Sequence, residues 1–119
     1  MELRYFTFEE FDSPDSPGSG EKYMDREFMG CIDEARDIAG VQFNINSGYR
    51  TIAQNRKVGG LSTSSHLIGR AADIHCVDTR KRLKIIEGLS MVGFQRFGIA
   101  KTFIHVDNDD QKPQAIWLY

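Results

Sequence analysis

The length, composition and charge of the chain exclude several classes of protein. Its 119 residues can build one hydrophobic core but not two independent ones, so we expect a single domain over residues 1–119. Apolar residues make up 40% of the chain and charged residues 27%, the balance of a folded globular protein and not of a disordered or fibrous one. The formal net charge of −2 offers no basic surface, so we expect no nucleic acid or membrane partner.

No segment has the pattern of a membrane span or a signal peptide. No run approaches the ~18 apolar residues that span a bilayer. Residues 1–6 lack a basic region followed by an apolar one, so we expect the chain to be made in the cytoplasm. The two cysteines, Cys31 and Cys76, lack the spacing of metal ligands and are expected to be small buried hydrophobic residues.

The first forty residues predict an aromatic segment, a loop and a helix. Aromatic residues at positions 6, 8 and 11 precede a loop rich in Pro, Gly and Ser over residues 12–20, which we expect to pack on the domain through its aromatic lead. Apolar residues then recur every three or four positions from Tyr23 to Ala39, as in an amphipathic helix. Gly40 stands where a C-terminal cap is expected.

The middle of the chain predicts two strands around a short helix. Apolar and polar residues alternate from Val41 to Asn46, which indicates a strand with one buried face. Thr51 can cap a short helix over residues 52–58, and a polar loop follows over residues 61–65. Residues 71–76 form the second predicted strand.

A second long helix and three short strands are expected in the last part of the chain. Asp78 or Thr79 can cap this helix, and Gly93 ends it. Its apolar positions are Leu83, Ile86, Leu89 and Met91 or Val92. The strands lie near residues 96–99, 103–107 and 115–119. Since helices come first and strands gather late, we predict an α+β fold, with two main helices packed on a mostly antiparallel sheet.

Two of the three histidines stand near carboxylates. His66 lies at the end of the polar loop, and Asp73 begins a strand seven residues later. The small residues between them allow a metal ion and the backbone to approach closely. Alternation along residues 103–107 places His105 and Asp107 on one face of a strand. Two imidazoles and one carboxylate leave the fourth tetrahedral position of Zn²⁺ open for water, as in catalytic zinc sites, although this spacing also occurs among unrelated surface or capping histidines.

The segment from Ser64 to Asp73 resembles a known motif. It is similar, position by position, to the S-x-H-x-x-G-x-A-x-D motif of the zinc D-Ala-D-Ala carboxypeptidases and murein endopeptidases, a family that includes many phage endolysins and has a hedgehog-like fold. Residues 45–50 resemble the strand and S-G-Y-R segment of this family, and residues 103–107 resemble its third-ligand strand. The resemblance extends from about Val41 to Trp117, and the first 22 residues add little to it.

The resemblance implies a zinc-dependent hydrolase that cuts the peptidoglycan stem peptide, as a D,D-carboxypeptidase or an endolysin-type endopeptidase. It implies that His66, Asp73 and His105 bind the metal and that Arg50 binds a substrate carboxylate or carbonyl. A guanidinium suits that role because it donates two parallel hydrogen bonds to a carboxylate, although a solvated residue at a helix start is the alternative. Ser64 is a second substrate-binding candidate, as a hydrogen-bonding group of the ligand loop and not as a nucleophile, because no base is placed to activate it.

One position departs from the family pattern. Many relatives carry an acidic general base three positions before the third ligand, where this chain has Thr102, and a threonine hydroxyl cannot act as a base at neutral pH. Asp107 is the nearest carboxylate: it is the catalytic base, or it orients an imidazole, or it is a solvated turn residue. Thr102 also motivates an alternative function, a non-catalytic metal-containing module that binds the cell wall or builds a virion.

The remaining candidates carry less weight. We expect His75 to be a partly exposed residue at a strand end, and Trp117 and Tyr119 are equally core or lid aromatics or platforms for sugar rings. Residues 107–110 lack the spacing of a calcium loop and are interpreted as a turn. A chain that acts on the cell wall without a signal peptide is expected to be a phage or prophage protein, and a small hydrolase of this kind is expected to be a monomer.

Overall fold

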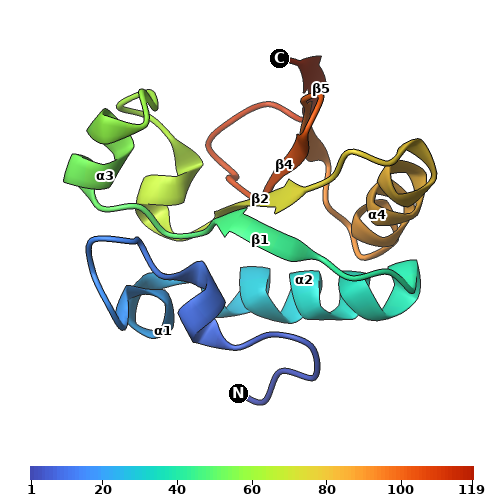
Figure 1. Ribbon diagram of the computed structural model, residues 1–119, viewed down its shortest axis with the longest axis horizontal. Coiled ribbons are helices and arrows are strands. Elements are labelled where there is room, and N and C mark those ends of the chain that lie inside the picture. The colour runs from blue at the N-terminus through green and yellow to red at the C-terminus, as the bar shows by residue number, and fades with distance from the viewer.

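The computed structural model describes residues 1–119 and shows helices packed against a five-stranded sheet (Figure 1). The strands are β1 (Asn44–Ser47), β2 (Ala71–His75), β3 (Arg96–Ile99), β4 (Phe103–Asp107) and β5 (Ala115–Leu118). The helices are α1 (Ser19–Tyr23), α2 (Arg26–Ala39), α3 (Ile52–Lys57) and α4 (Thr79–Met91), with short 3-10 segments at Phe8–Phe11 and Ser65–Ile68.

The strands follow the order β1-β2-β4-β3-β5 across the sheet. All neighbours are antiparallel except β3 and β5, which run parallel. The predicted α+β class with a mostly antiparallel sheet is therefore confirmed. In Figure 1, α2 lies along one side of β1, whereas α3 lies on the other side. The alternation of side chains along β2 and β4 separates a buried apolar face from a polar one.

Helix α2 begins later than the periodicity predicted. Asp25 caps it by accepting a hydrogen bond from the Phe28 backbone N–H, and Gly40 ends it in the left-handed conformation with φ 68°. The expected start at Tyr23 is wrong, because Tyr23 ends the separate helix α1 and the chain is extended at Met24. The cap at Asp25, not the apolar period, sets the boundary.

Helix α4 begins where it was predicted and buries most of the predicted face. Asp78 caps it by accepting hydrogen bonds from two backbone N–H groups. Its buried residues are Ile85, Gly88 and Leu89, whereas Leu83 is 61% exposed and Met91 is 71% exposed. Of the expected apolar positions, Leu89 is buried, and Ile86 and Val92 are partly buried against the core, so only the expectation for Leu83 is wrong. Of the alternatives Met91 and Val92, Val92 is the one that faces the core. Gly88 allows the backbone of α4 to approach α2 closely.

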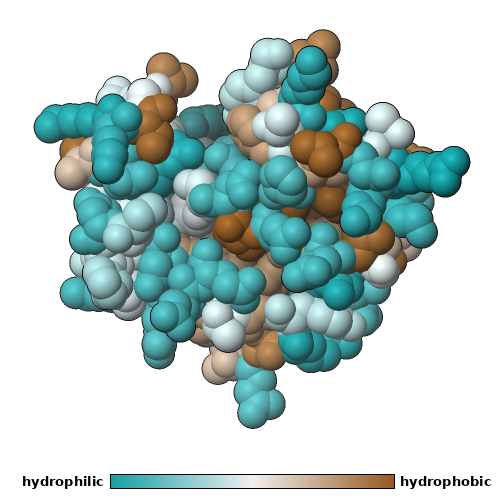
Figure 2. All heavy atoms as spheres, in the orientation of Figure 1, coloured by the Kyte–Doolittle hydropathy of each residue, from teal (hydrophilic) through white to brown (hydrophobic).

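The hydrophobic core lies between α2, α4 and one face of the sheet. Its buried members include Phe28 and Ile32 from α2, Leu89 from α4, and Ile74 and Ile104 from the sheet. Of the cysteines, Cys76 is buried as expected, and Cys31 is only partly buried. On the face drawn in Figure 2, hydrophilic and hydrophobic side chains are interspersed. None of the helices combines the length and the apolar character that a membrane crossing requires.

The N-terminal segment packs on the hydrophobic core through its aromatic residues, as predicted. Phe11 is fully buried and lies edge-on to Phe6, with ring centroids 5.4 Å apart. The Phe11 carbonyl accepts a hydrogen bond from the Tyr49 backbone N–H at 2.9 Å. A Cβ at Gly48 would lie 2.7 Å from the Phe11 Cα, so the absence of a side chain there allows the two segments to touch.

Two helical glycines give opposite expectations for substitution by alanine. At Gly88 a Cβ would lie 2.5 Å from the Ala35 carbonyl oxygen and 2.9 Å from the Ala39 Cβ. We expect G88A to lower the free energy of unfolding by about 1–2 kcal/mol, because overpacking outweighs the gain in helix propensity. At Gly30 a Cβ would meet only the Met1 side chain, at 3.5 Å. G30A should stabilise the protein by about 0.5–1 kcal/mol in urea denaturation, and equal effects of the two substitutions would contradict this account.

Candidate metal centre

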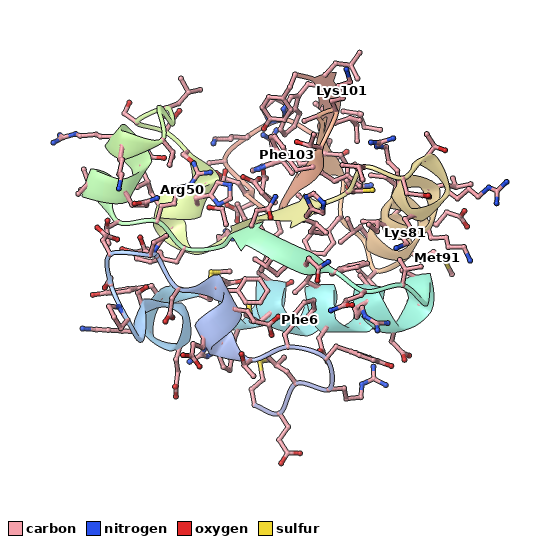
Figure 3. All side chains as sticks on the ribbon, viewed as in Figure 1. Phe6, Arg50, Lys81, Met91, Lys101 and Phe103 are labelled. Atoms are coloured by element: carbon pink, nitrogen blue, oxygen red, sulfur yellow. The ribbon has the colours of Figure 1, made fainter.

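Three side chains from separate parts of the chain meet on the polar face of the sheet. His66 comes from the 3-10 segment after α3, Asp73 from β2 and His105 from β4. One ligand atom from each lies within 4.8 Å of the other two. Asp73 and His105 are direct cross-strand partners, so both side chains project from the same face. Of the side chains labelled in Figure 3, Arg50 and Phe103 lie on this side of β1 and Phe6 lies on the other.

The His66 ring is oriented by a backbone carbonyl of the segment that directly follows β1. Its Nδ1–H donates to the Gly48 carbonyl oxygen at 2.7 Å, since a carbonyl can only accept. In the neutral ring, Nε2 therefore carries a lone pair, and it faces Asp73 Oδ1 at 3.2 Å. Two acceptors that face each other require a proton or a cation between them.

His105 lies between two carboxylates. Its Nε2 is 2.7 Å from Asp107 Oδ2, and its Nδ1 is 2.9 Å from Asp73 Oδ1. Burial alone would lower the pKa of His105, but hydrogen bonds to Asp107 and Asp73 outweigh it and raise the pKa. Burial alone would raise the pKa of Asp73, but hydrogen bonds from His105 and His66 hold that pKa well below its usual range.

This donor set fits a divalent cation. Nε2 of His66, Nδ1 of His105 and a carboxylate oxygen of Asp73 converge, and both histidines are buried, with 2% and 7% of their surface exposed. A neutral imidazole donates from only one nitrogen, so a hydrogen bond from each outer nitrogen leaves the inner lone pair for a metal. Two imidazoles and a carboxylate are ligands that zinc accepts.

Asp107 is buried, and both of its carboxylate oxygens accept hydrogen bonds. It is 1% exposed, so it is not a solvated turn residue. Its Oδ2 accepts from His105 Nε2, and its Oδ1 accepts from Arg96 Nε at 2.7 Å and from the Asp109 backbone N–H at 3.1 Å. Burial would raise the pKa of Asp107, but the hydrogen bonds from His105 and Arg96 lower it. No pattern in the sequence singles out Arg96, because its contact with Asp107 depends on the pairing of β3 with β4, in which Phe97 lies opposite Val106.

Arg50 lies beside the cluster and is mostly buried, with 14% of its side chain exposed. Its guanidinium donates to Asp73 Oδ2 at 3.2 Å, to Ser47 Oγ at 3.0 Å and to Asn55 Oδ1 at 3.2 Å. The alternative of a solvated residue at a helix start therefore does not describe it. Ser64 caps the 3-10 segment that carries His66, and its Oγ accepts from the His66 backbone N–H at 3.3 Å.

The cluster opens into a cleft of about 490 Å³. Arg50, Ser64 and the loop around Leu61 line one part of it, and three aromatic residues line another. These aromatic residues are Phe103, Trp117 and Tyr119. Trp117 lies 5.5 Å from the His105 ring, and Tyr119 lies 5.1 Å from the Phe103 ring.

Two other candidates lie away from the cleft. His75 ends β2 and is exposed, as predicted. Thr102, at the position of the usual acidic residue, is exposed in the turn between β3 and β4 and does not line the cleft. Asp73 and Asp107 are the carboxylates that line it.

Hydrogen bonds join the loop that precedes and carries His66, around residues 63–66, to the segment after β4. Ser65 Oγ donates to Asp109 Oδ2 at 2.7 Å and accepts from Lys112 Nζ at 2.9 Å. Lys112 also donates to the Thr63 carbonyl at 2.6 Å. The turn predicted for residues 107–110 lies later in the chain, because Asp107 is the last residue of β4 and the turn is at residues 110–111. Asp109, between the strand and the turn, is buried and holds the loop that carries His66.

Residues 5–107 match the family Peptidase M15, so the chain belongs to this peptidase family. The resemblance carried by the motif from Ser64 to Asp73 is confirmed. The match begins at Tyr5, so the expectation that the first 22 residues add little is wrong: the segment that supports Gly48 and Tyr49 is part of the family pattern. No curated protein matches the chain at a significant level.

The contacts of His105 predict how the protein behaves when a chelator removes divalent ions. We expect the His105 imidazole to titrate above 6.5, as measured from its ¹⁵N chemical shifts. A raised pKa in the folded state contributes stability that is complete below pH 6.5 and is lost as the pH rises through the folded pKa. D107N should lower the pKa of His105, because it removes one of the two carboxylates. An imidazole that stays neutral down to pH 6 would contradict the proposed contacts.

Proposed function

We propose that this chain is a zinc-dependent peptidase that hydrolyses peptide bonds of the peptidoglycan stem peptide. The observation that carries the proposal is the convergence of His66, Asp73 and His105 on one point of an open cleft, in a member of a peptidase family. These three side chains would hold the metal. Bound there, zinc would polarise the scissile carbonyl and lower the pKa of water.

Arg50 is the proposed substrate-binding group. Three of its five N–H groups are used by Asp73, Ser47 and Asn55, which leaves two N–H groups for a ligand in the cleft. A guanidinium held rigidly by neighbours loses little entropy when it binds a carboxylate. Stem peptides carry such carboxylates on D-Glu and on the terminal D-Ala, and Arg50 would fix one of them near the metal.

Asp107 is proposed to orient His105. Its Oδ2 accepts a hydrogen bond from His105 Nε2–H, which directs the Nδ1 lone pair toward Asp73 and the metal position. Its other oxygen already has two donors, Arg96 Nε and the Asp109 backbone. With Thr102 outside the cleft, Asp107 is also the carboxylate that could accept a proton from water, and variants separate the two roles.

Metal content and digestion products test the proposal directly. We expect about one zinc per chain by elemental analysis, and H66A and H105A should lose it, whereas H75A, at an exposed histidine, should keep it. Phenanthroline should abolish release of new termini from peptidoglycan, and added zinc should restore it. Mass spectrometry of the digest identifies the bond and so separates a D,D-carboxypeptidase from an endopeptidase.

Other results of the same experiments would favour the alternative function or reject zinc binding. Zinc at full occupancy with no new termini would indicate a non-catalytic module that binds the cell wall or belongs to a virion, which the threonine at position 102 favours. Absence of zinc from the purified protein and from the protein incubated with zinc would reject the proposal. A phage or prophage source and a monomeric state stay predictions of the sequence.

Substitutions of Asp107 distinguish a residue that orients His105 from one that acts as the catalytic base. Asparagine keeps an oxygen that can accept from His105 Nε2, whereas alanine removes it. If Asp107 orients His105, we expect D107A to weaken zinc binding about 10–100-fold and D107N to weaken it less. If Asp107 is the base, both variants should keep zinc and lose most of kcat, by about 10²–10⁴-fold. Zinc titration and steady-state kinetics on the same preparations distinguish these results.

A further inference from the structure

We infer that Arg96 is a positioning residue for His105, acting through Asp107, and that Trp117 holds Arg96 in place. Neither residue belongs to the ligand set proposed above. The inference rests on the proposed function in one respect, namely that His105 binds zinc. It adds a support for the metal that comes from β3 and β5, the two strands that follow β4 at this side of the sheet.

The contact between Arg96 and His105 runs through two short hydrogen bonds. Arg96 Nε donates to Asp107 Oδ1 at 2.7 Å, and His105 Nε2 donates to Asp107 Oδ2 at 2.7 Å. The two oxygens of one carboxylate are thus held from opposite sides. Arg96 also donates from Nη1 to the Pro113 carbonyl, which anchors the guanidinium to the segment before β5. The carboxylate of Asp107 cannot rotate without breaking a charged hydrogen bond.

Burial makes this contact costly to lose. Asp107 is 1% exposed and Arg96 has 13% of its side chain exposed, so water replaces the guanidinium poorly. A buried carboxylate that loses a charged partner must turn toward another donor. That rotation would weaken or redirect the hydrogen bond from His105 Nε2. The Nδ1 lone pair of His105 would then no longer be held toward the metal position.

Trp117 completes the support from the neighbouring strand. The Arg96 guanidinium lies over the Trp117 ring, 4.9 Å from its centroid. Such a contact between a cation and an aromatic face is favourable and keeps the guanidinium in one plane. A Cβ at Gly98 would lie 2.6 Å from Trp117 Nε1, so the glycine in β3 makes the space in which this ring lies.

The support from β5 is a property of this chain's C-terminal part. The family match ends at Asp107, and β5 follows it at Ala115–Leu118. Arg96 and Asp107 lie within the matched residues, whereas Trp117 and Pro113 lie outside them. The geometry therefore points to a metal ligand whose orientation depends in part on contacts outside the matched residues 5–107.

Zinc affinity of the purified protein tests the inference without relying on activity. We expect R96Q to weaken zinc binding about 10–100-fold in competition with a chromophoric chelator, because supports of metal ligands typically have effects of this size. The visible absorption of the cobalt-substituted protein should also change, since it reports ligand geometry. R96K keeps the charge but not the planar fork and should fall between R96Q and the parent protein. It also serves as the test if R96Q does not fold.

A matched control separates this role from the loss of any buried arginine. Arg70 donates from Nε to Asn108 Oδ1 at 3.0 Å and has 24% of its side chain exposed, but it contacts neither Asp107 nor His105. R70Q should leave zinc affinity and the cobalt spectrum unchanged. W117L should weaken zinc binding several-fold. Trp117 also lies 5.5 Å from the His105 ring, so the double variant R96Q/W117L separates the two contacts. If Trp117 acts through the guanidinium, the double variant should bind zinc no more weakly than R96Q, and a further loss would overturn the role of Trp117 as the support of Arg96.

Three results would overturn the inference. The first is an R96Q protein with parental zinc affinity and cobalt spectrum. The second is an R96Q protein in which only KM rises, since Arg96 would then contact substrate directly. The third is an equal loss of affinity in R70Q. Failure of the proposed function looks different: the parent protein would bind no zinc, or H105A would bind it as tightly as the parent.

Discussion

The pairing of β2 with β4 is the constraint on which the candidate site depends. In this antiparallel register Asp73 lies opposite His105, and both side chains project from the polar face. Their neighbours Ile74 and Ile104 are fully buried on the other face. A slip of one residue would exchange the two sets and place apolar side chains in the cleft. The packing that fixes the core therefore also fixes two of the three proposed metal ligands.

The charged groups of the site form a central cluster with two arginines around it. At the centre, one carboxylate oxygen of Asp73 faces two imidazole nitrogens, and only a proton or a cation satisfies all of them. Around this centre, Arg50 binds the other oxygen of Asp73, and Arg96 binds Asp107. Asp73 and Asp107 thus each have a guanidinium partner, which offsets the cost of removing the carboxylate from water. This arrangement holds the ligand atoms in place before a metal binds.

The sequence alone determined the features that depend on residues close together in the chain. The caps at Asp78 and Gly40 follow from hydrogen bonds and backbone conformation within one helical turn, so they were found from residue type and spacing. His66 and Asp73 lie within ten residues and carry a recognisable motif. Alternation along β4 placed His105 and Asp107 on one face, because strand geometry has a period of two.

The tertiary structure decided what depends on contacts between distant segments. The pairing of Arg96 with Asp107 requires the register of β3 against β4, which no local pattern specifies. The buried face of α4 was predicted at Leu89, Ile86 and Val92 but not at Leu83, which is exposed. The close approach of α4 to α2 at Gly88 was not predicted, because it joins two helices far apart in the chain. The support of Gly48 by Phe11 likewise joins residues far apart in the chain. Local hydrogen bonds leave a readable pattern in the sequence, whereas long-range packing selects one arrangement among many that the same pattern allows.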